Sequence, residues 1–164
     1  MKLAPLAAVA LCVTFAAAPA QAQSFVLNGV THCGGNLTNP EVGVHFNLPA
    51  GTHNVQWVSG AYSLWSSNGE NGGNTWIAVA RAYVYATGET ITFGSTDGFQ
   101  PTSSAAEAGA LGTYPITLTT ASQVSFYLSD GGGCGDNRGN ITLQLESPVP
   151  TVPATWGAIK GLYR

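Results

Sequence analysis

The chain has 164 residues, of which only 8% are charged and 45% are hydrophobic, with a formal net charge of −3. Average soluble proteins carry roughly 25% charged residues, and a chain this apolar is not a charge-rich disordered one. The negative charge argues against nucleic acids and anionic membranes as partners. With 21 glycines and 9 prolines, the composition favours short strands and tight turns in one domain of ordinary size.

Residues 1–22 have the three parts of a secretory signal peptide. Lys2 supplies a positive start, Leu3 to Ala18 is an apolar run, and Ala20-Gln21-Ala22 is a small-x-small cleavage site. A membrane anchor is the alternative, but the apolar core is shorter than the ~20 residues that span a bilayer. We therefore expect a mature chain that is secreted or displayed at the cell surface, with the periplasm as a further location.

Removing the signal leaves two cysteines, Cys33 and Cys134. In an exported protein an even pair predicts a disulfide. This disulfide would close a loop of about a hundred residues, and the chain-entropy model assigns such a loop ~4–5 kcal/mol of stabilisation. The alternative is a metal site formed by both cysteines and His32, but this sequence lacks the paired CxxC or HxxxH spacing of such sites.

Short strands are predicted across residues 23–147. Alternation of apolar and polar residues is clearest over Val124–Leu128 and Ile141–Leu145, as in half-buried strands. No segment outside the signal has a helical stripe of ten or more residues, which excludes parallel βαβ units. We therefore predict an all-β domain, a β-sandwich or jelly roll. The predicted strands are Ser24–Val30, Val42–Asn47, His53–Ser59, Trp76–Tyr85, Thr90–Gly94, Gly112–Thr119, Gln123–Ser129 and Asn140–Glu146.

Two segments are predicted to be loops, residues 66–74, which are polar and rich in glycine, and residues 98–109. Long loops at one end of a rigid sandwich usually carry function. Trp65 and Trp76 flank the first loop and Tyr62 precedes it. Aromatic rings beside polar groups suit the apolar faces and hydroxyls of sugars. For each ring, a place in the core is the alternative interpretation.

The most informative motif is Asp-Gly-Gly-Gly-Cys-Gly-Asp-Asn-Arg-Gly over residues 130–139. It joins two predicted strands and is longer than a hairpin requires. Asp130, Asp136 and Asn137 offer oxygen ligands, and Ca²⁺ takes roughly 6–8 oxygens. The glycines allow backbone carbonyls to turn inward as further ligands. The motif therefore indicates a calcium site, and an Asx-rich turn that satisfies its own backbone is the alternative.

The segment from Val124 to Leu145 resembles the calcium- and sugar-binding end of the PA-IL-like galactose-binding lectins, which are small bacterial β-sandwich proteins. The shared pattern is an apolar strand, Asp130, a glycine-rich turn, the Asp136-Asn137 pair, x, Gly139 and a closing strand. A looser match runs from Pro49 to Tyr62, where the family has an early strand that leads into an aromatic loop. The resemblance implies a galactose-binding-domain-like fold.

The resemblance also implies a role for each matched residue. Asp130, Asp136 and Asn137 would be side-chain calcium ligands, Cys134 would supply a backbone carbonyl, and Tyr62 or Leu64 would supply another. The hydroxyls of a galactose-type saccharide would complete the calcium shell. The expected sugar contacts are Tyr62, Trp65, Trp76, Asp130 and Asn137.

This chain departs from the family pattern at several points. The turn is one residue shorter, Asp136 replaces the first amide of the usual pair, and Cys134 lies within the loop. The family's middle loop, which touches the sugar with His and Gln, has no clear counterpart, because residues 66–74 contain no histidine. Because of these departures, the resemblance does not specify which sugar is bound.

An enzymatic function is disfavoured, because the chain has no GxSxG, HExxH, P-loop or GxGxxG motif. We therefore expect a calcium-dependent carbohydrate-binding protein, for which a homo-oligomer would multiply the sites and raise avidity. The alternative is a calcium-stabilised structural or adhesive surface protein without a sugar site.

Residues 148–164 are predicted to be a separate tail. Three prolines between 148 and 153 predict an extended linker. The final segment, Trp156 to Arg164, is too short for a stable isolated helix or a membrane span. One interpretation is a sorting or docking tag read by a secretion or attachment partner, and the other is a frayed or packed terminus.

Overall fold

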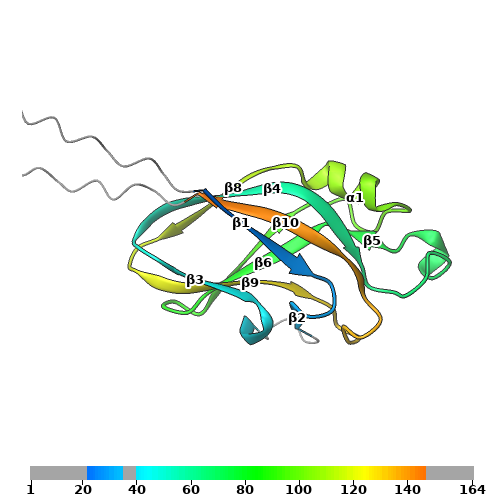
Figure 1. The fold of residues 1–164 in the computed structure, drawn as a ribbon, viewed down its shortest axis with the longest axis horizontal. Helices are drawn as coiled ribbons and strands as arrows, with labels where there is room; N and C mark the ends of the chain where they lie inside the picture. Colours follow the sequence, from blue (N-terminus) through cyan, green and yellow to red (C-terminus); the bar gives the residue numbers. More distant parts are fainter. Residues whose placement is uncertain (1–21, 35–39, 147–164) are drawn as a thin grey trace, which may run out of the picture. The chain divides into compact units, whose positions relative to one another are not determined.

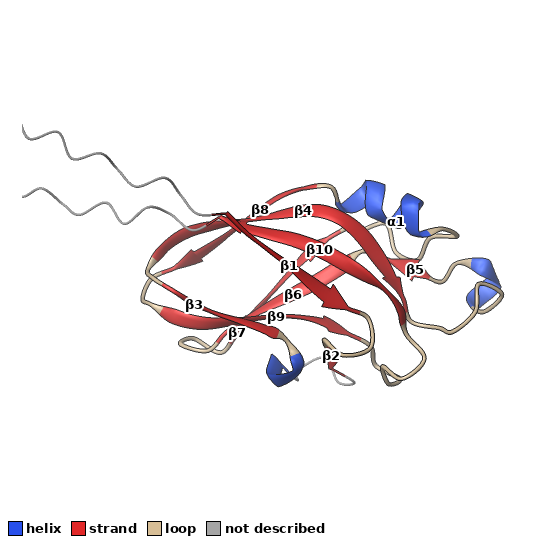
Figure 2. Cartoon of the chain, viewed as in Figure 1, coloured by secondary structure: helices blue, strands red, loops and turns tan. Residues whose placement is uncertain are grey.

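The computed structural model describes residues 22–34 and 40–146. The predicted C-terminal linker and tail lie outside the described residues, as does the predicted signal peptide except for Ala22. The described chain is mostly β, and its strands form two sheets stacked as the layers of a sandwich (Figures 1 and 2). The prediction of an all-β fold is confirmed at this level.

The first sheet is built around the long strand β4 (Gly51–Ser63). On one side β4 pairs with β10 (Arg138–Glu146), and β10 pairs with the edge strand β1 (Ala22–Asn28). On the other side β4 pairs first with β8 (Gly112–Leu118) and then, near its end, with β5 (Trp76–Ile77). All of these pairings are antiparallel, so β4 ends beside the start of β10.

The second sheet is built around β9 (Ser122–Ser129). It pairs antiparallel with β3 (Val44–Leu48) on one side and with β6 (Val79–Val84) on the other, and β6 pairs with β7 (Glu89–Gly94). The two-residue strand β2 (Cys33–Gly34) pairs with the end of β9 in parallel. This short pairing brings the chain near Cys33 to the point where β9 ends.

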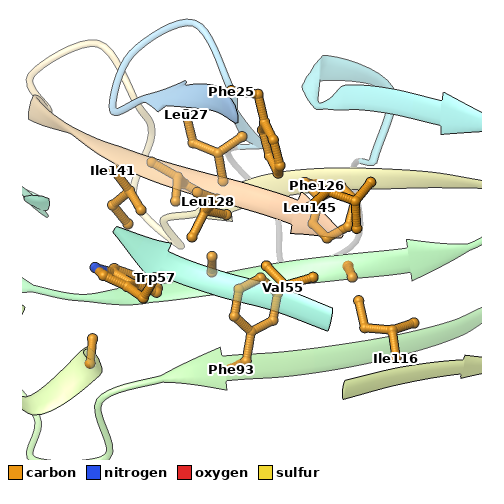
Figure 3. Close-up of a cluster of buried hydrophobic side chains, with 14 of the residues drawn as sticks. Phe25, Leu27, Val55, Trp57, Phe93, Ile116, Phe126, Leu128, Ile141 and Leu145 are labelled. Carbon is orange, nitrogen blue, oxygen red and sulfur yellow. The ribbon is translucent and has the colours of Figure 1, made fainter. Parts of the chain in front are cut away.

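The core lies between the two sheets and follows the predicted alternation. Phe25 of β1 faces Leu143 of β10, and Leu143 faces Trp57 of β4. The cluster is closed from the second sheet by Phe93 and Phe126, whose ring centroids lie 6.3 Å apart (Figure 3). Because each inward side chain of a strand is followed by an outward one, the period-two pattern identified the buried face of β10 correctly. In β9 the prediction of a half-buried strand was wrong, because Ser125 and Tyr127 on its other face are buried as well.

The structure corrects three sequence predictions. The predicted strand Trp76–Tyr85 is broken at Ala78, and its two halves join different sheets. Strand β2 was not predicted. The expected loop at 98–109 contains the helix α1 (Ser103–Ala110), whose N-cap Thr102 accepts a hydrogen bond from the Ala105 amide. Hydroxyl caps of this kind satisfy a free amide of the first turn. Two 3-10 helices, η1 (Pro40–Val42) and η2 (Asn71–Gly73), complete the described elements.

Within residues 22–34 and 40–146, none of the helices has the length and apolar character needed to cross a lipid bilayer.

Gly139 marks a place where β10 passes close to its neighbours. Its φ is +90°, and a Cβ there would lie 2.5 Å from the Ala61 carbonyl oxygen and 2.9 Å from the Trp76 ring. We expect Gly139→Ala to lower the free energy of unfolding by about 2 kcal/mol or more, from backbone strain and overpacking. Urea denaturation measures this loss. The matched control Gly69→Ala, where a Cβ meets nothing within 4 Å, should change stability little, and equal effects at both positions would contradict the argument.

Candidate functional site

A hollow of about 290 Å³ opens at the end of the sandwich where β4 and β9 finish. Two chain segments form it, one directly after β4 and one the connection between β9 and β10; both lie toward the right of Figure 1. The residues that line it are Leu64, Trp65, Asp130, Gly132, Gly133 and Asp136. The structure thus brings together four of the predicted site residues from two distant parts of the sequence.

Asp130 is the first residue after β9 and is only 7% exposed. Its Oδ1 accepts a hydrogen bond of 2.9 Å from the Gly132 amide, which is an Asx turn of the type expected as the alternative to a metal site. Its own amide donates to the Gly34 carbonyl at 3.4 Å. The Asx turn occupies one carboxylate oxygen, and the side chain still lines the hollow.

Asn137 is buried, at 6% exposure, just before β10 begins. Its Nδ2 donates to the Gly29 carbonyl oxygen at 3.0 Å and to Cys33 Sγ at 3.3 Å. Its Oδ1 is buried and has no hydrogen-bond partner. A buried acceptor without a partner costs about 1–3 kcal/mol. Asn137 is not among the residues that line the hollow, and its amide nitrogen contacts the segment 29–34 instead.

Asp136 is exposed and lines the hollow from the far side of the same connection. Between the two aspartates, Cys134 forms a disulfide with Cys33, which confirms the predicted pairing. The alternative of a metal site with two cysteines and His32 is excluded, because both sulfurs are used in this bond. The Cys134 carbonyl accepts a hydrogen bond of 3.3 Å from the Asn137 amide, and its second lone pair remains for a ligand.

Tyr62 and Leu64 were the two candidates for a carbonyl ligand from the segment around the end of β4. Tyr62 lies within β4, paired to Gly139 on one side and to Ile77 on the other, whereas Leu64 follows the strand and lines the hollow. The position of Leu64 therefore suits the role better. The Tyr62 ring is only 2% exposed and belongs to the core, so it offers no face to a sugar, contrary to the expectation for that residue.

The two tryptophans have different surroundings. Trp65 is half-buried, lines the hollow and meets Phe99 edge-on with ring centroids 5.1 Å apart. The Arg138 guanidinium lies over the Trp76 ring, with its Cζ 4.9 Å from the ring centroid. The Trp76 Nε1 donates a hydrogen bond to Asn68 Oδ1. Trp65 is therefore placed to touch a ligand in the hollow. Trp76 is not among the lining residues, and its contacts hold the loop to the sheet.

Arg138 joins the loop after β4 to the start of β10. Its Nε donates to the Trp65 carbonyl oxygen at 3.1 Å, and its Nη2 donates to Asn68 Oδ1. Ser63 supports the same point, because its Oγ donates to the Trp65 carbonyl at 2.9 Å and accepts from the Trp65 amide at 3.2 Å. These bonds fix the backbone of Trp65 beside the aspartates.

The donor set available here consists of carboxylate, amide and carbonyl oxygens. In the part of the chain that the structure describes, no group of three or more His, Cys, Asp or Glu side chains is arranged to hold a metal. A site at the hollow would therefore draw on backbone oxygens as well as on the two aspartates that line it. Such hard oxygen ligands suit calcium rather than zinc or copper.

Searches of family models, of characterised proteins and of solved structures returned no match to this chain.

The sequence interpretation missed the parts of the site that depend on tertiary contacts. Gly132 and Gly133 line the hollow, Arg138 orders the loop after β4, and Gly29 accepts the Asn137 amide. The pairing of two cysteines was the only sequence signal that residues 29–34 lie against the β9–β10 connection.

The Tyr62 hydroxyl links β4 to the end of β9. It donates a hydrogen bond of 3.1 Å to the carbonyl oxygen of Ser129, the residue before Asp130. Burial raises the pKa of Tyr62 above its ordinary 10.0, and the Asp130 carboxylate also raises it. Above about pH 10 the unfolded phenol ionises while the folded one stays protonated, so folding stability falls as pH rises.

We expect Tyr62→Phe to cost about 1 kcal/mol at neutral pH, because one hydrogen bond is lost. We also expect a shallower loss of stability above pH 10, because one tyrosine with a raised pKa is removed. Urea denaturation at pH 7 and at several pH values above 10 measures both effects. An alkaline slope equal to that of the wild type would contradict the assignment.

Proposed function

We propose that this protein binds a saccharide through a calcium ion held in the hollow at the end of the sandwich. The observation that carries the proposal is that Asp130, Asp136 and Trp65 line the same hollow although they come from two segments far apart in the sequence. Acidic oxygens beside an aromatic wall are the combination that the sequence motif and the lectin resemblance both predict.

Charge supports the cation part of this proposal. Asp130 and Asp136 line one small hollow, and two carboxylates at close range repel each other unless a cation lies between them. Arg138 is the nearest basic residue in the sequence, but its guanidinium is engaged with Trp65, Asn68 and Trp76. The buried Asn137 Oδ1 adds an acceptor that lacks a partner. A divalent cation would neutralise the two carboxylates of the hollow, whereas Asn137, which does not line it, would have to turn its Oδ1 toward the ion to join them.

Shape and surface chemistry support the saccharide part. The volume of about 290 Å³ lies at the lower end of ligand pockets, which suits one sugar ring rather than a long glycan. Trp65 supplies an aromatic surface for the C–H face of the ring. Vicinal hydroxyls would complete the calcium shell, as the resemblance to the PA-IL-like lectins implies, and galactose-type saccharides are the class proposed.

The same observations fit a second function without sugar recognition. Calcium would then serve only to stabilise the conformation of the β9–β10 connection. The protein would act as a structural or adhesive component of a surface. The burial of Asp130 and Asn137 favours this alternative, because at 7% and 6% exposure little of either side chain is accessible to a sugar. The two functions share the cation and differ in whether a glycan is bound.

Asp136→Ala tests the cation. The residue is exposed, so the variant should fold normally but lose most of its calcium affinity. Isothermal calorimetry measures the affinity, and thermal unfolding measures the stabilisation by Ca²⁺, about 2.7 kcal/mol for the wild type at a hundredfold excess over Kd. Glu89→Ala is the matched control, since it removes the same charge from the start of β7. Flat heats with the wild type and an unchanged melting temperature would overturn the proposal.

Trp65→Ala tests the saccharide. We expect a glycan array to show binding by the wild type that vanishes with EDTA, and Trp65→Ala to lose that binding while keeping its calcium affinity. Phe99→Ala is the control, because it breaks the same ring contact but leaves the wall of the hollow in place. Calcium binding with no glycan signal in either condition would favour the structural alternative.

A further inference from the structure

The β9–β10 connection, residues 130–137, is attached at three points to the segment 29–34, which precedes it by about a hundred residues. The Asp130 amide donates to the Gly34 carbonyl, Cys134 is bonded to Cys33, and the Asn137 side chain donates to Gly29. The first and last of these contacts are made by two of the proposed calcium ligands themselves. The segment 29–34 therefore acts as a template for the connection.

Between these attachments the connection is packed loosely. A Cβ added at Gly131, Gly133 or Gly135 would meet nothing within 4 Å. Glycine backbones have more conformational freedom to lose than any other residue, so the loop depends on the three attachments and on its two internal hydrogen bonds, from Gly132 to Asp130 and from Asn137 to Cys134. The disulfide is the one covalent attachment, and it lies between the two aspartates in the sequence.

The template segment is held rigid by its own hydrogen bonds. Asn28 Oδ1 accepts from the Val30 amide at 2.9 Å and from the Thr31 amide at 3.0 Å, and His32 Nδ1 accepts from the Asn28 amide at 3.0 Å. The Leu128 amide donates to the His32 carbonyl at 2.8 Å, which fixes the segment to β9. Asn28 therefore shapes the turn on which the connection rests, without lying in the hollow.

We propose that Cys33, Cys134 and Asn28 are positioning residues for the cation site, so that calcium affinity depends on the oxidised state of the Cys33–Cys134 bond. This inference rests on the proposed calcium site. Asn137 is part of the link, because its Nδ2 donates to Cys33 Sγ at 3.3 Å and so holds the residue next to Asp136, which lines the hollow. Loss of the bond releases both Cys134 and the sulfur that Asn137 contacts.

The energetic reason is preorganisation. A loop that is already ordered binds a ligand without losing further conformational freedom, whereas a free glycine-rich loop must be ordered by the cation itself. Groups that orient metal ligands typically contribute a factor of roughly 10–100 in affinity. Binding free energies are reciprocal, so calcium must in turn make the disulfide harder to reduce by the same factor.

The first experiment compares the redox states of the whole protein. A dithiol such as dithiothreitol transfers two electrons and two protons to the bond, which gives two thiols, and becomes a cyclic disulfide itself. We expect calcium affinity to fall roughly 10- to 100-fold after reduction and in the Cys33→Ser, Cys134→Ser double variant. Saturating calcium should shift the dithiol equilibrium of the native protein toward the disulfide by the same factor, with magnesium as the control ion.

The second experiment leaves the disulfide intact and so avoids its effect on global stability. Asn28→Ala removes the two bonds to the Val30 and Thr31 amides, and we expect calcium affinity to fall by about tenfold. Asn140→Ala is the matched control. It breaks the bond of 2.8 Å between Asn28 Nδ2 and Asn140 Oδ1 but keeps the turn, so affinity should stay near that of the wild type.

The outcomes separate this inference from the proposal on which it rests. If the oxidised wild type binds no calcium, the cation site itself is wrong and the inference falls with it. If calcium binds with equal affinity before and after reduction, and Asn28→Ala matches Asn140→Ala, the cation site stands and only the inference is overturned. If the double variant does not fold, the dithiol equilibrium of the native protein and the Asn28→Ala comparison still decide the question.

Discussion

The attachment of the β9–β10 connection to the segment after β1 is the constraint on which the rest of the site depends. A loop of this composition has no packing of its own, because most of its glycines face open space. The Cys33–Cys134 bond and the Asn137 amide convert it into a defined surface. Without that fixed surface, Asp130 and Asp136 would be two acidic residues on a flexible turn, and the hollow beside Trp65 would lose one of its walls.

The two sheets contribute to the site because their central strands end at the same end of the sandwich. Strand β4 is the centre of the first sheet and β9 the centre of the second, and the hollow lies where both finish. Arg138, the first residue of β10, bonds with its side chain to the loop that follows β4. The site is thus assembled at the rim of a rigid scaffold, where loops can vary without disturbing the core.

Much of the scaffold could be predicted from the sequence, because burial on one face of a strand leaves a period of two in the residues. Ile141, Leu143 and Leu145 are all buried as that pattern requires. The break at Ala78 left no such signal. Ala78 and Ala80 are both buried, as in one continuous strand, and only the pairings of Ile77 with Tyr62 and of Val79 with Gly94 show that the chain changes sheets between them. Helix α1 was missed because seven of its eight residues are Ser, Ala or Gly and form no helical stripe.

The candidate site was predictable in its chemistry but not in its geometry. Sequence order placed Asp130, Asp136 and Asn137 on one turn, and the lectin resemblance added Trp65 and either Tyr62 or Leu64. Only the folded chain shows that Leu64 and Trp65 line the hollow with the two aspartates, that Asn137 does not, and that the Tyr62 ring is in the core. The reason is that side-chain direction at a strand end depends on register and bulges, and the β4–β10 pairing shifts register between Thr142 and Leu143.

The use of Arg138 has a consequence for selectivity. Its guanidinium keeps its positive charge while it contacts a carbonyl, an amide oxygen and an indole ring, and the carbonyl belongs to Trp65, which lines the hollow beside the two carboxylates. With two carboxylates and one guanidinium, the hollow and its margin carry about one net negative charge, which would favour a cation over an anion as the first ligand. Binding of a divalent ion, as proposed, would reverse the sign of that balance, so acidic glycans would be repelled by the metal-free form and not by the loaded one.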